Sequence, residues 1–243
     1  MSKPSISTIL SPRLLELYDV SNSIVVIIDV FRATSTIATA LYNGARKVIP
    51  VDNVEQCIAM GRNLNAITAG ERDGKIIPGL QYGNSPAEYY RDFIQDKTLV
   101  LTTTNGTKLL HMALAKGATE IITGSFLNLT AVCDHLKKIN KNVILACAGW
   151  KDRVNMEDTL FAGAVVLDVQ QHFAINCDSS QIAITLYKQA RQDMYGFMKE
   201  HEASHYQRLT NFGLEKDIRH CLTPDLANVL PEYVNGKLVV LKD

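Results

Sequence analysis

The sequence has no excess of charge of either sign, because 25 Lys and Arg residues balance 25 Asp and Glu residues over 243 positions. It therefore lacks the global basic field that would favour nucleic acid or an acidic membrane surface as a partner. No apolar run approaches the roughly 20 residues that cross a bilayer, and segment 1–12 has no apolar core of the kind found in signal peptides. We expect a cytoplasmic protein with no nucleic-acid or membrane partner, in which any binding of anions is local.

Paired cysteines are also missing. The five cysteines are an odd number and form no C-x-x-C pair, so reduced thiols are the simplest interpretation. No low-complexity tract, long charge run or obvious linker divides the chain, and 47% of its residues are hydrophobic, enough to bury a large core. We predict a single domain over 1–243, in which 172–243 could form a sub-lobe.

What the sequence does contain is a repeated strand–loop–helix rhythm. Apolar segments such as 24–28, 98–101 and 142–147 alternate with segments typical of helices. This alternation predicts a three-layer α/β/α fold with a largely parallel, mixed sheet. Near the C-terminus, segment 179–221 is polar and helical, and Asn235-Gly236 between two apolar segments predicts a β-hairpin.

The first candidate site follows the apolar, β-branched run 24–28. Asp29 comes directly after this run, and Arg32, Thr34 and Ser35 precede a helix-like segment. A carboxylate at the end of a strand, followed by an arginine and hydroxyls at a helix start, is the arrangement of an anion or metal–phosphate site. An alternative remains open, in which Asp29 pairs with Arg32 and a hydroxyl caps the helix.

Other acidic residues lie where further strands are expected to end. In a parallel sheet these ends share one edge, where ligands bind. Carboxylates gathered there would repel one another unless a hard cation lay between them, and Mg²⁺ prefers oxygen ligands of this kind. We predict a Mg²⁺ site with ligands among Asp29, Glu71, Glu157 and Asp158. Glu157 and Asp158 also suit the first turn of a helix without any ligand.

Two further segments carry helix-start patterns. Ser85-Pro86-Ala87-Glu88 combines a cap, a first-turn proline and a capping glutamate, so a helix is expected to begin there. T-T-T-N-G-T at 102–107 joins a strand to a helix, and its glycine would let backbone N–H groups approach a phosphate. An ordinary Asn-Gly turn is the alternative.

Several cations could neutralise a polyanionic substrate, although each alone fits a solvated surface charge. They are Arg32, Arg72, Lys75, Lys151 and Arg153.

Two short motifs suggest other chemistry. Cys147 and Arg153 have the C-x-x-x-x-x-R spacing of cysteine-based phosphatases, in which a thiolate attacks phosphorus. Acidic residues crowd the same loop and would raise the pKa of the thiol, which weighs against this mechanism. His201-Glu202-Ala203-Ser204-His205 matches the H-E-x-x-H zinc motif. Its surroundings are charged on all sides, so a solvated helix face is the better interpretation.

Five ordered blocks are more specific than either motif. They are D-V-F-R-A-T-S-T-I at 29–37, A-G-E-R at 69–72, P-G-L-Q-Y-G-N-S-P-A-E at 78–88, T-T-T-N-G-T at 102–107, and C-A-G-W-K-D-R with E-D-T at 147–159. Together they resemble the 2-phosphosulfolactate phosphatase (ComB-type) family over most of the chain. The resemblance implies a Mg²⁺-dependent phosphatase with an α/β fold, which hydrolyses 2-phosphosulfolactate, or a related 2-phospho-acid, to 3-sulfolactate and phosphate on the route to coenzyme M.

This hypothesis gives each candidate residue a role towards a small anionic phosphorylated sulfocarboxylate. Asp29 and its acidic partners hold Mg²⁺, or Asp29 is itself the nucleophile. Phosphate oxygens are held by Arg32, Thr34, Ser35, Asn105, Gly106 and Thr107, while Arg72, Lys75 or Arg153 binds the carboxylate and sulfonate. A homo-oligomer is possible. The competing hypothesis is a non-catalytic sensor that binds a phosphorylated or sulfonated metabolite at the same edge.

Overall fold

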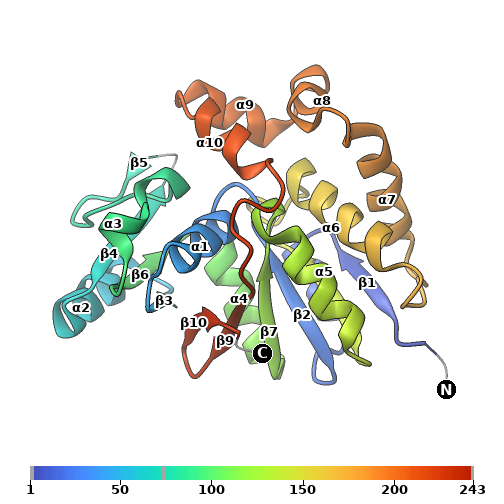
Figure 1. The fold of residues 1–243 in the computed structure, drawn as a ribbon, viewed down its shortest axis with the longest axis horizontal. Helices are drawn as coiled ribbons and strands as arrows, with labels where there is room; N and C mark the ends of the chain where they lie inside the picture. The colour runs from blue at the N-terminus through green and yellow to red at the C-terminus, as the bar shows by residue number, and fades with distance from the viewer. Residues whose placement is uncertain (1–2, 73–74, 242–243) are drawn as a thin grey trace.

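The structure is a computed structural model that describes residues 3–72 and 75–241. Over these residues ten strands form one mixed, mostly parallel sheet in the order β1-β8-β2-β7-β9-β10-β3-β6-β4-β5, with helices on its faces (Figure 1). The predicted α/β fold is thus confirmed, including the C-terminal helices and hairpin. The strands are β1 (Ile6–Ile9), β2 (Ser23–Ile28), β3 (Lys47–Pro50), β4 (Ile67–Arg72), β5 (Lys75–Ile76), β6 (Thr98–Thr102), β7 (Glu120–Gly124), β8 (Asn142–Cys147), β9 (Pro231–Val234) and β10 (Lys237–Val240).

The helices connect these strands and then form a separate C-terminal layer. Helices α8, α9 and α10 lie across the top of the molecule in Figure 1, above α1 and the C-terminal end of β2. None of the helices in the described ranges is both long and apolar enough to cross a membrane. The α-helices are α1 (Ala33–Tyr42), α2 (Val54–Leu64), α3 (Arg91–Ile94), α4 (Gly106–Ala115), α5 (Leu129–Lys138), α6 (Met156–Val169), α7 (Asp178–Ala190), α8 (Met194–Glu200), α9 (Ser204–Asn211) and α10 (Glu215–Cys221), and the 3₁₀ helices are η1 (Pro12–Leu17), η2 (Pro86–Glu88) and η3 (Phe126–Asn128).

Strand β2 is buried on both faces, as its apolar sequence predicts. Ile24, Val26 and Ile28 pack into a core with α5, α6 and α7. Val25 and Ile27 point the other way, into a core with α1, α4, β3 and β6. Because successive side chains of a strand alternate between faces, only a run without polar residues can fill both cores.

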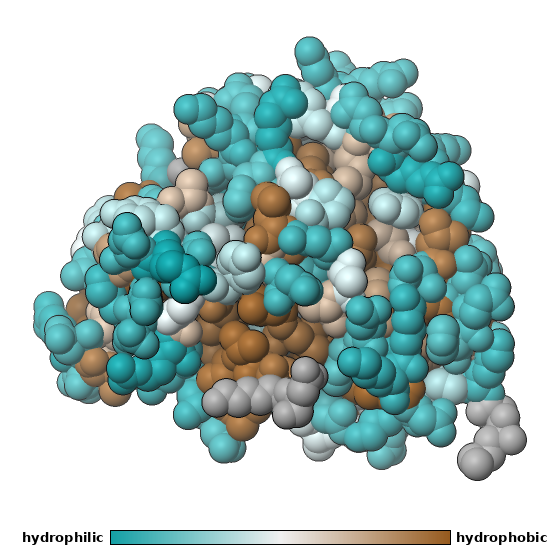
Figure 2. Space-filling model, in the orientation of Figure 1, coloured by the Kyte–Doolittle hydropathy of each residue, from teal (hydrophilic) through white to brown (hydrophobic). Residues whose placement is uncertain are grey.

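The C-terminal hairpin lies in the middle of the sheet. Its strands are joined by Asn235 and Gly236 with φ values of 49° and 82°, as a two-residue hairpin turn requires. Strand β9 pairs antiparallel with β7, and β10 pairs antiparallel with β3. The hairpin therefore joins two parallel groups, β1-β8-β2-β7 and β3-β6-β4. Figure 2 shows apolar residues gathered below α1, beside this hairpin, within an otherwise largely hydrophilic face.

The three antiparallel pairings through the hairpin reverse the strand direction between the two groups. In a flat sheet the C-terminal ends of β2 and β6 would then lie at opposite edges. However, Ile27, Pro50, Leu101 and Leu238, which come from four different strands, line one narrow apolar space. This closeness shows that the sheet twists and curls. The prediction of a shared edge relied on the parallel part of the predicted mixed sheet, whereas the ends of β2 and β6 meet because the sheet curls.

The prediction that a helix begins at Ser85-Pro86 is wrong about the helix's type and length. Only the 3₁₀ turn η2 forms there, and α3 begins five residues after Pro86, at Arg91. The Glu88 carboxylate accepts a hydrogen bond from the Gly83 backbone N–H at 2.8 Å. It thereby stabilises the preceding loop instead of an α-helix.

Candidate active site

A cavity of about 250 Å³ opens beside the C-terminal end of β2. It is lined by the loops that follow β2, β6 and β8, by the end of β4 and by α9. The residues predicted for the site that contribute to its wall are Asp29, Arg32, Glu71, Arg72, Asn105 and Lys151. Segments far apart in the chain thus converge at one place, as the sequence predicted.

Asp29 is fixed by the first turn of α1. The Thr34 N–H and hydroxyl both donate to the Asp29 carbonyl oxygen, at 3.0 Å and 2.8 Å, and the Ala33 N–H donates to carboxylate Oδ1 at 3.4 Å. Burial raises the pKa of Asp29 to about 6; the His205 ring opposes this effect, whereas the Glu157 and Glu71 carboxylates add to it. A desolvated carboxylate with other acidic groups nearby is the environment expected around a bound cation.

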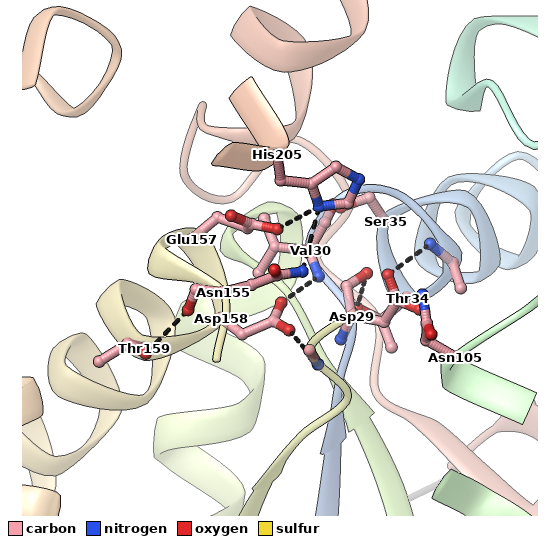
Figure 3. A network of polar contacts seen from close by, with 12 residues as sticks. Asp29, Val30, Thr34, Ser35, Asn105, Asn155, Glu157, Asp158, Thr159 and His205 are labelled. Carbon is pink, nitrogen blue, oxygen red and sulfur yellow. Dashed lines mark hydrogen bonds and ion pairs between the residues drawn. The ribbon is translucent and has the colours of Figure 1, made fainter. Parts of the chain in front are cut away.

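The buried Glu157 carboxylate pairs with the partly buried His205 ring next to Asp29 (Figure 3). His205 Nδ1 lies 2.5 Å from Glu157 Oε1 and 3.2 Å from Asn155 Nδ2. The second carboxylate oxygen, Glu157 Oε2, is buried and has no hydrogen-bond partner among the residues that the structure describes. Because buried polar atoms are almost always paired, this oxygen is a candidate contact for a bound group.

Asp158 has a different role from its neighbour. Its Oδ1 accepts a hydrogen bond from the Val30 N–H at 2.9 Å, and its Oδ2 accepts one from the Gly149 N–H at 3.0 Å (Figure 3). Burial raises its pKa well above the usual range, and Glu157 and Asp29 add to this. Neither Asp158 nor Glu157 is part of the cavity wall. With both carboxylate oxygens bound to backbone N–H groups, Asp158 joins the loops after β2 and β8, whereas its role as a metal ligand stays a prediction.

The N-terminus of α4 faces Asp29. A Cβ atom on Gly106 would lie 2.9 Å from Asp29 Oδ2, so only glycine permits this approach. Asn105 lines the cavity and accepts a weak hydrogen bond from the Lys151 N–H at 3.4 Å. The free N–H groups of a helix start bind anions, so Asn105 and Gly106 remain well placed for a phosphate. The Thr107 hydroxyl instead donates to the Thr103 carbonyl at 2.7 Å, within the turn.

Arg32, Thr34 and Ser35 make contacts that the sequence did not predict. Arg32 Nη1 lies 2.5 Å from Asp217 Oδ2, and both side chains are buried. The alternative in which Arg32 pairs with Asp29 is therefore wrong. The Ser35 hydroxyl donates to the Val30 carbonyl at 2.8 Å, and neither Thr34 nor Ser35 lines the cavity. The two hydroxyls shape the loop after β2, which corrects their prediction as phosphate ligands.

The cysteine mechanism is also contradicted. Cys147 is fully buried, and burial, followed by the charges of Asp158 and Glu157, raises the pKa of its thiol well above the usual value. Arg153 is exposed and lies outside the cavity wall. A neutral, inaccessible thiol cannot attack phosphorus.

Replacing Cys147 with Ala is accordingly expected to leave turnover close to that of the wild type, with a small loss of stability from the vacated volume. Steady-state phosphate release together with thermal unfolding would measure both effects. Loss of turnover in a variant that still folds would restore Cys147 as the nucleophile.

The H-E-x-x-H match does not form a zinc site. Helix α8 ends at Glu200 with His201 as its C-cap, Glu202 has a φ of 49°, and α9 starts at Ser204. The two histidines are therefore not on one helix. Within the described part of the chain, no group of three or more His, Cys, Asp or Glu side chains is arranged to hold a metal ion. His205 alone reaches the cavity, and its partner is Glu157.

The sequence analysis assigned no site role to several further residues of the cavity wall. Trp150 follows β8, Asn84 precedes η2, and Arg208 and Phe212 come from α9 and its C-terminal end. Trp150 stood within a recognised block, but nothing in the polar segment 201–213 distinguishes Arg208 from a surface arginine. Only the position of α9 over the strand ends brings it to the site.

Comparison with known proteins identifies the family of this site. A profile of 2-phosphosulpholactate phosphatase matches residues 9–236. The chain belongs to the 2-phosphosulfolactate phosphatase family. Its relatives include proteins named probable 2-phosphosulfolactate phosphatase from Thermotoga petrophila, 41% identical over 88% of this chain and 91% of the relative, and from Caldanaerobacter subterraneus subsp. tengcongensis, 38% identical over 91% and 96%. The relative from Thermotoga maritima is 40% identical over 88% of this chain and 91% of its own.

The 2-phosphosulfolactate phosphatase family, to which this chain belongs, is a family of phosphoric monoester hydrolases. The resemblance seen in the five sequence blocks is thereby confirmed. The blocks also supply most of the cavity wall, since Asp29, Glu71, Asn84, Thr103 and Trp150 each come from a different one. The part of the chain that is similar to the family is thus the part that builds the site.

Proposed function

We propose that this protein hydrolyses 2-phosphosulfolactate, or a closely related 2-phospho-acid, to the 2-hydroxy acid and phosphate. The family supports the reaction class. The single observation that carries the proposal is the position of the Asp29 carboxylate, buried at the cavity wall against the N-terminus of α4. A phosphate bound there would meet the helix N–H groups on one side and a group of carboxylates that needs a cation on the other.

The carboxylates fit a Mg²⁺ ion of the kind that phosphoryl transfer uses. Mg²⁺ commonly takes one or two protein carboxylates and completes its shell with water and phosphate oxygens, so a preformed group of three ligands is not required. Asp29 would hold it, with Glu157 or Glu71 as second ligand, since both act on Asp29 electrostatically and Glu157 Oε2 is unpaired within the described ranges. The ion supplies neutralisation of charge on the transferred phosphoryl group.

The protein's own groups position the reactants. Hydrolysis forms a bond from a water oxygen to phosphorus and breaks the bond from phosphorus to the C2 oxygen of the substrate, which then takes up a proton. The Asn105-Gly106 turn holds the phosphoryl oxygens, while His205, oriented by Glu157 through Nδ1, exchanges the proton. In-line positioning and charge neutralisation provide most of the rate enhancement in such reactions.

A phosphate-release assay with 2-phosphosulfolactate tests this function. Treatment with EDTA is expected to lower turnover by at least about a hundredfold, because several kcal/mol of charge stabilisation are removed, and added Mg²⁺ is expected to restore it. Glycerol 2-phosphate, which has no acidic group besides its phosphate, serves as the control substrate. Full turnover in EDTA would exclude the metal. Tight binding of the anion without release of phosphate would instead support the sensor hypothesis.

A further inference from the structure

Arg208 is the cavity residue that the phosphatase chemistry leaves unexplained. It lies on α9, three residues after His205, and lines the same cavity. Its Nη2 atom is buried without a hydrogen-bond partner in the described residues. Burial lowers the pKa of its guanidinium, an effect that the Glu157 carboxylate opposes. A guanidinium in a cavity with an unused donor is a ready receptor for an anion.

Two other arginines of the wall already have oxygen partners. Arg32 is paired with Asp217, and Arg72 Nη1 donates to the Glu71 carbonyl at 2.8 Å. Lys151 lies over the ring of Trp150, with Nζ 4.4 Å from the ring centroid. Among the described cations of the cavity, the unsatisfied donor thus belongs to Arg208.

Trp150 holds Arg208 in place. The guanidinium carbon of Arg208 is 3.9 Å from the centroid of the Trp150 ring, within the range of a cation–π contact. This contact restrains the guanidinium beside the ring, and its N–H groups can donate hydrogen bonds to a carboxylate or a sulfonate. The same ring also carries Lys151, so two positive charges lie together at this part of the cavity.

We propose that Arg208, held by Trp150 and assisted by Lys151, binds the acidic groups of the substrate that are not transferred, its carboxylate and sulfonate. This inference rests on the proposed function for the identity of the substrate. It replaces the prediction that Arg72, Lys75 or Arg153 binds these groups. Lys75 and Arg153 do not line the cavity, and Arg72, which does, donates to the Glu71 carbonyl. The site therefore selects phosphate esters that carry a second acidic group.

Trp150 is the single tryptophan of the sequence, so intrinsic fluorescence reports on this subsite directly. Titration with 3-sulfolactate is expected to change the emission of the wild-type protein. In Arg208→Met the dissociation constant for 3-sulfolactate should rise by roughly 10- to 100-fold, the effect of losing hydrogen bonds to a charged group. The constant for inorganic phosphate, measured by calorimetry in the presence of Mg²⁺, should stay unchanged.

Arg219→Met is the matched control. Arg219 also stacks on an aromatic ring of the C-terminal helices, with its guanidinium carbon 3.6 Å from the Tyr195 centroid, but it lies outside the cavity. This variant should bind 3-sulfolactate like the wild type. If Arg208→Met does not fold, Arg208→Lys retains the charge and loses the planar fork, and it should bind 3-sulfolactate more weakly.

Unchanged affinity for 3-sulfolactate in the folded Arg208 variant would overturn the inference. An equal loss of affinity for phosphate and 3-sulfolactate would also overturn it, because Arg208 would then bind the transferred group. Arg208-dependent binding of 3-sulfolactate by a protein that releases no phosphate would support the subsite and refute the proposed hydrolysis.

Discussion

Asp29→Asn is expected to reduce kcat/KM for 2-phosphosulfolactate by at least about a thousandfold, the loss seen when a group that acts in the transition state is removed. The amide is nearly isosteric with the carboxylate, so the hydrogen bond from the Ala33 N–H to Oδ1 can persist. What disappears is the negative charge, which either binds Mg²⁺ or attacks phosphorus. Rapid assays of phosphate release at saturating Mg²⁺ measure the effect.

The same substitution should stabilise the metal-free protein. The folded protein retains the Asp29 proton up to a pKa of about 6, whereas the unfolded chain releases it near 3.8. Between these values the folded state binds more protons, so wild-type stability falls as the pH rises. Asp29→Asn should remove this contribution and raise the Tm at pH 8. A gain in stability together with a loss of activity identifies a functional carboxylate.

Asp152→Asn is the control for this experiment. Asp152 lies in the neighbouring loop, and its carboxylate pairs with Lys108 at 2.6 Å and with Arg13 at 3.5 Å near the surface. It does not line the cavity, so the variant should retain activity. Near wild-type turnover in Asp29→Asn, with Mg²⁺ present, would remove Asp29 from both proposed roles.

Arg32→Met should destabilise the protein by about 3–5 kcal/mol, the usual result of removing one partner of a buried ion pair. Asp217 would lose its cationic partner in a buried position and, among the described residues, keep the hydrogen bond of 2.7 Å that the Ser85 hydroxyl donates to its Oδ1. This pair connects the loop after β2 to α10, so its loss should loosen the C-terminal helices over the cavity. Urea unfolding followed by circular dichroism gives the free energy of unfolding.

Two comparisons make the Arg32 result specific. Arg13→Met removes the exposed partner of Asp152, and exposed pairs contribute about 0–1 kcal/mol, so its effect should be small. The double variant Arg32→Met/Asp217→Met removes both buried charges and should recover much of the lost stability. If Arg32→Met unfolds at the same urea concentration as the wild type, the ion pair does not stabilise this fold.

The elements that depend on local sequence were predicted well. The run 24–28 became β2, Asn235-Gly236 became a hairpin turn, and the acidic first turn 157–158 opened α6. Each of these outcomes depends on neighbouring residues: an apolar run fits a strand buried on both faces, and positive φ at two positions selects Asn-Gly. The cavity's main acidic residue, Asp29, was also predicted, because a carboxylate after such a run needs a partner.

The errors concern side chains whose partners are distant in the chain. Arg32 pairs with Asp217, 185 positions away. The residues next to Arg32 in the sequence do not indicate this partner. Thr34 and Ser35 resemble phosphate ligands in the sequence, but their hydroxyls donate hydrogen bonds to the carbonyl oxygens of Asp29 and Val30 in the turn after β2. Glu157 and Asp158 are adjacent and chemically alike. Within the described residues, however, one Glu157 oxygen has no hydrogen-bond partner, whereas Asp158 binds two backbone N–H groups.

The sequence by itself therefore determined the α/β class, the family and the acidic residue at the end of β2, because these follow from short-range patterns and ordered blocks. Tertiary structure alone decided which polar groups face the cavity. It did so by curling the sheet until the ends of β2 and β6 meet and by placing α9, with His205 and Arg208, over them. Burial strengthens electrostatic interactions. The role of a polar side chain, whether it binds a ligand, holds two loops together or stays a surface charge, therefore depends on the atoms that surround it.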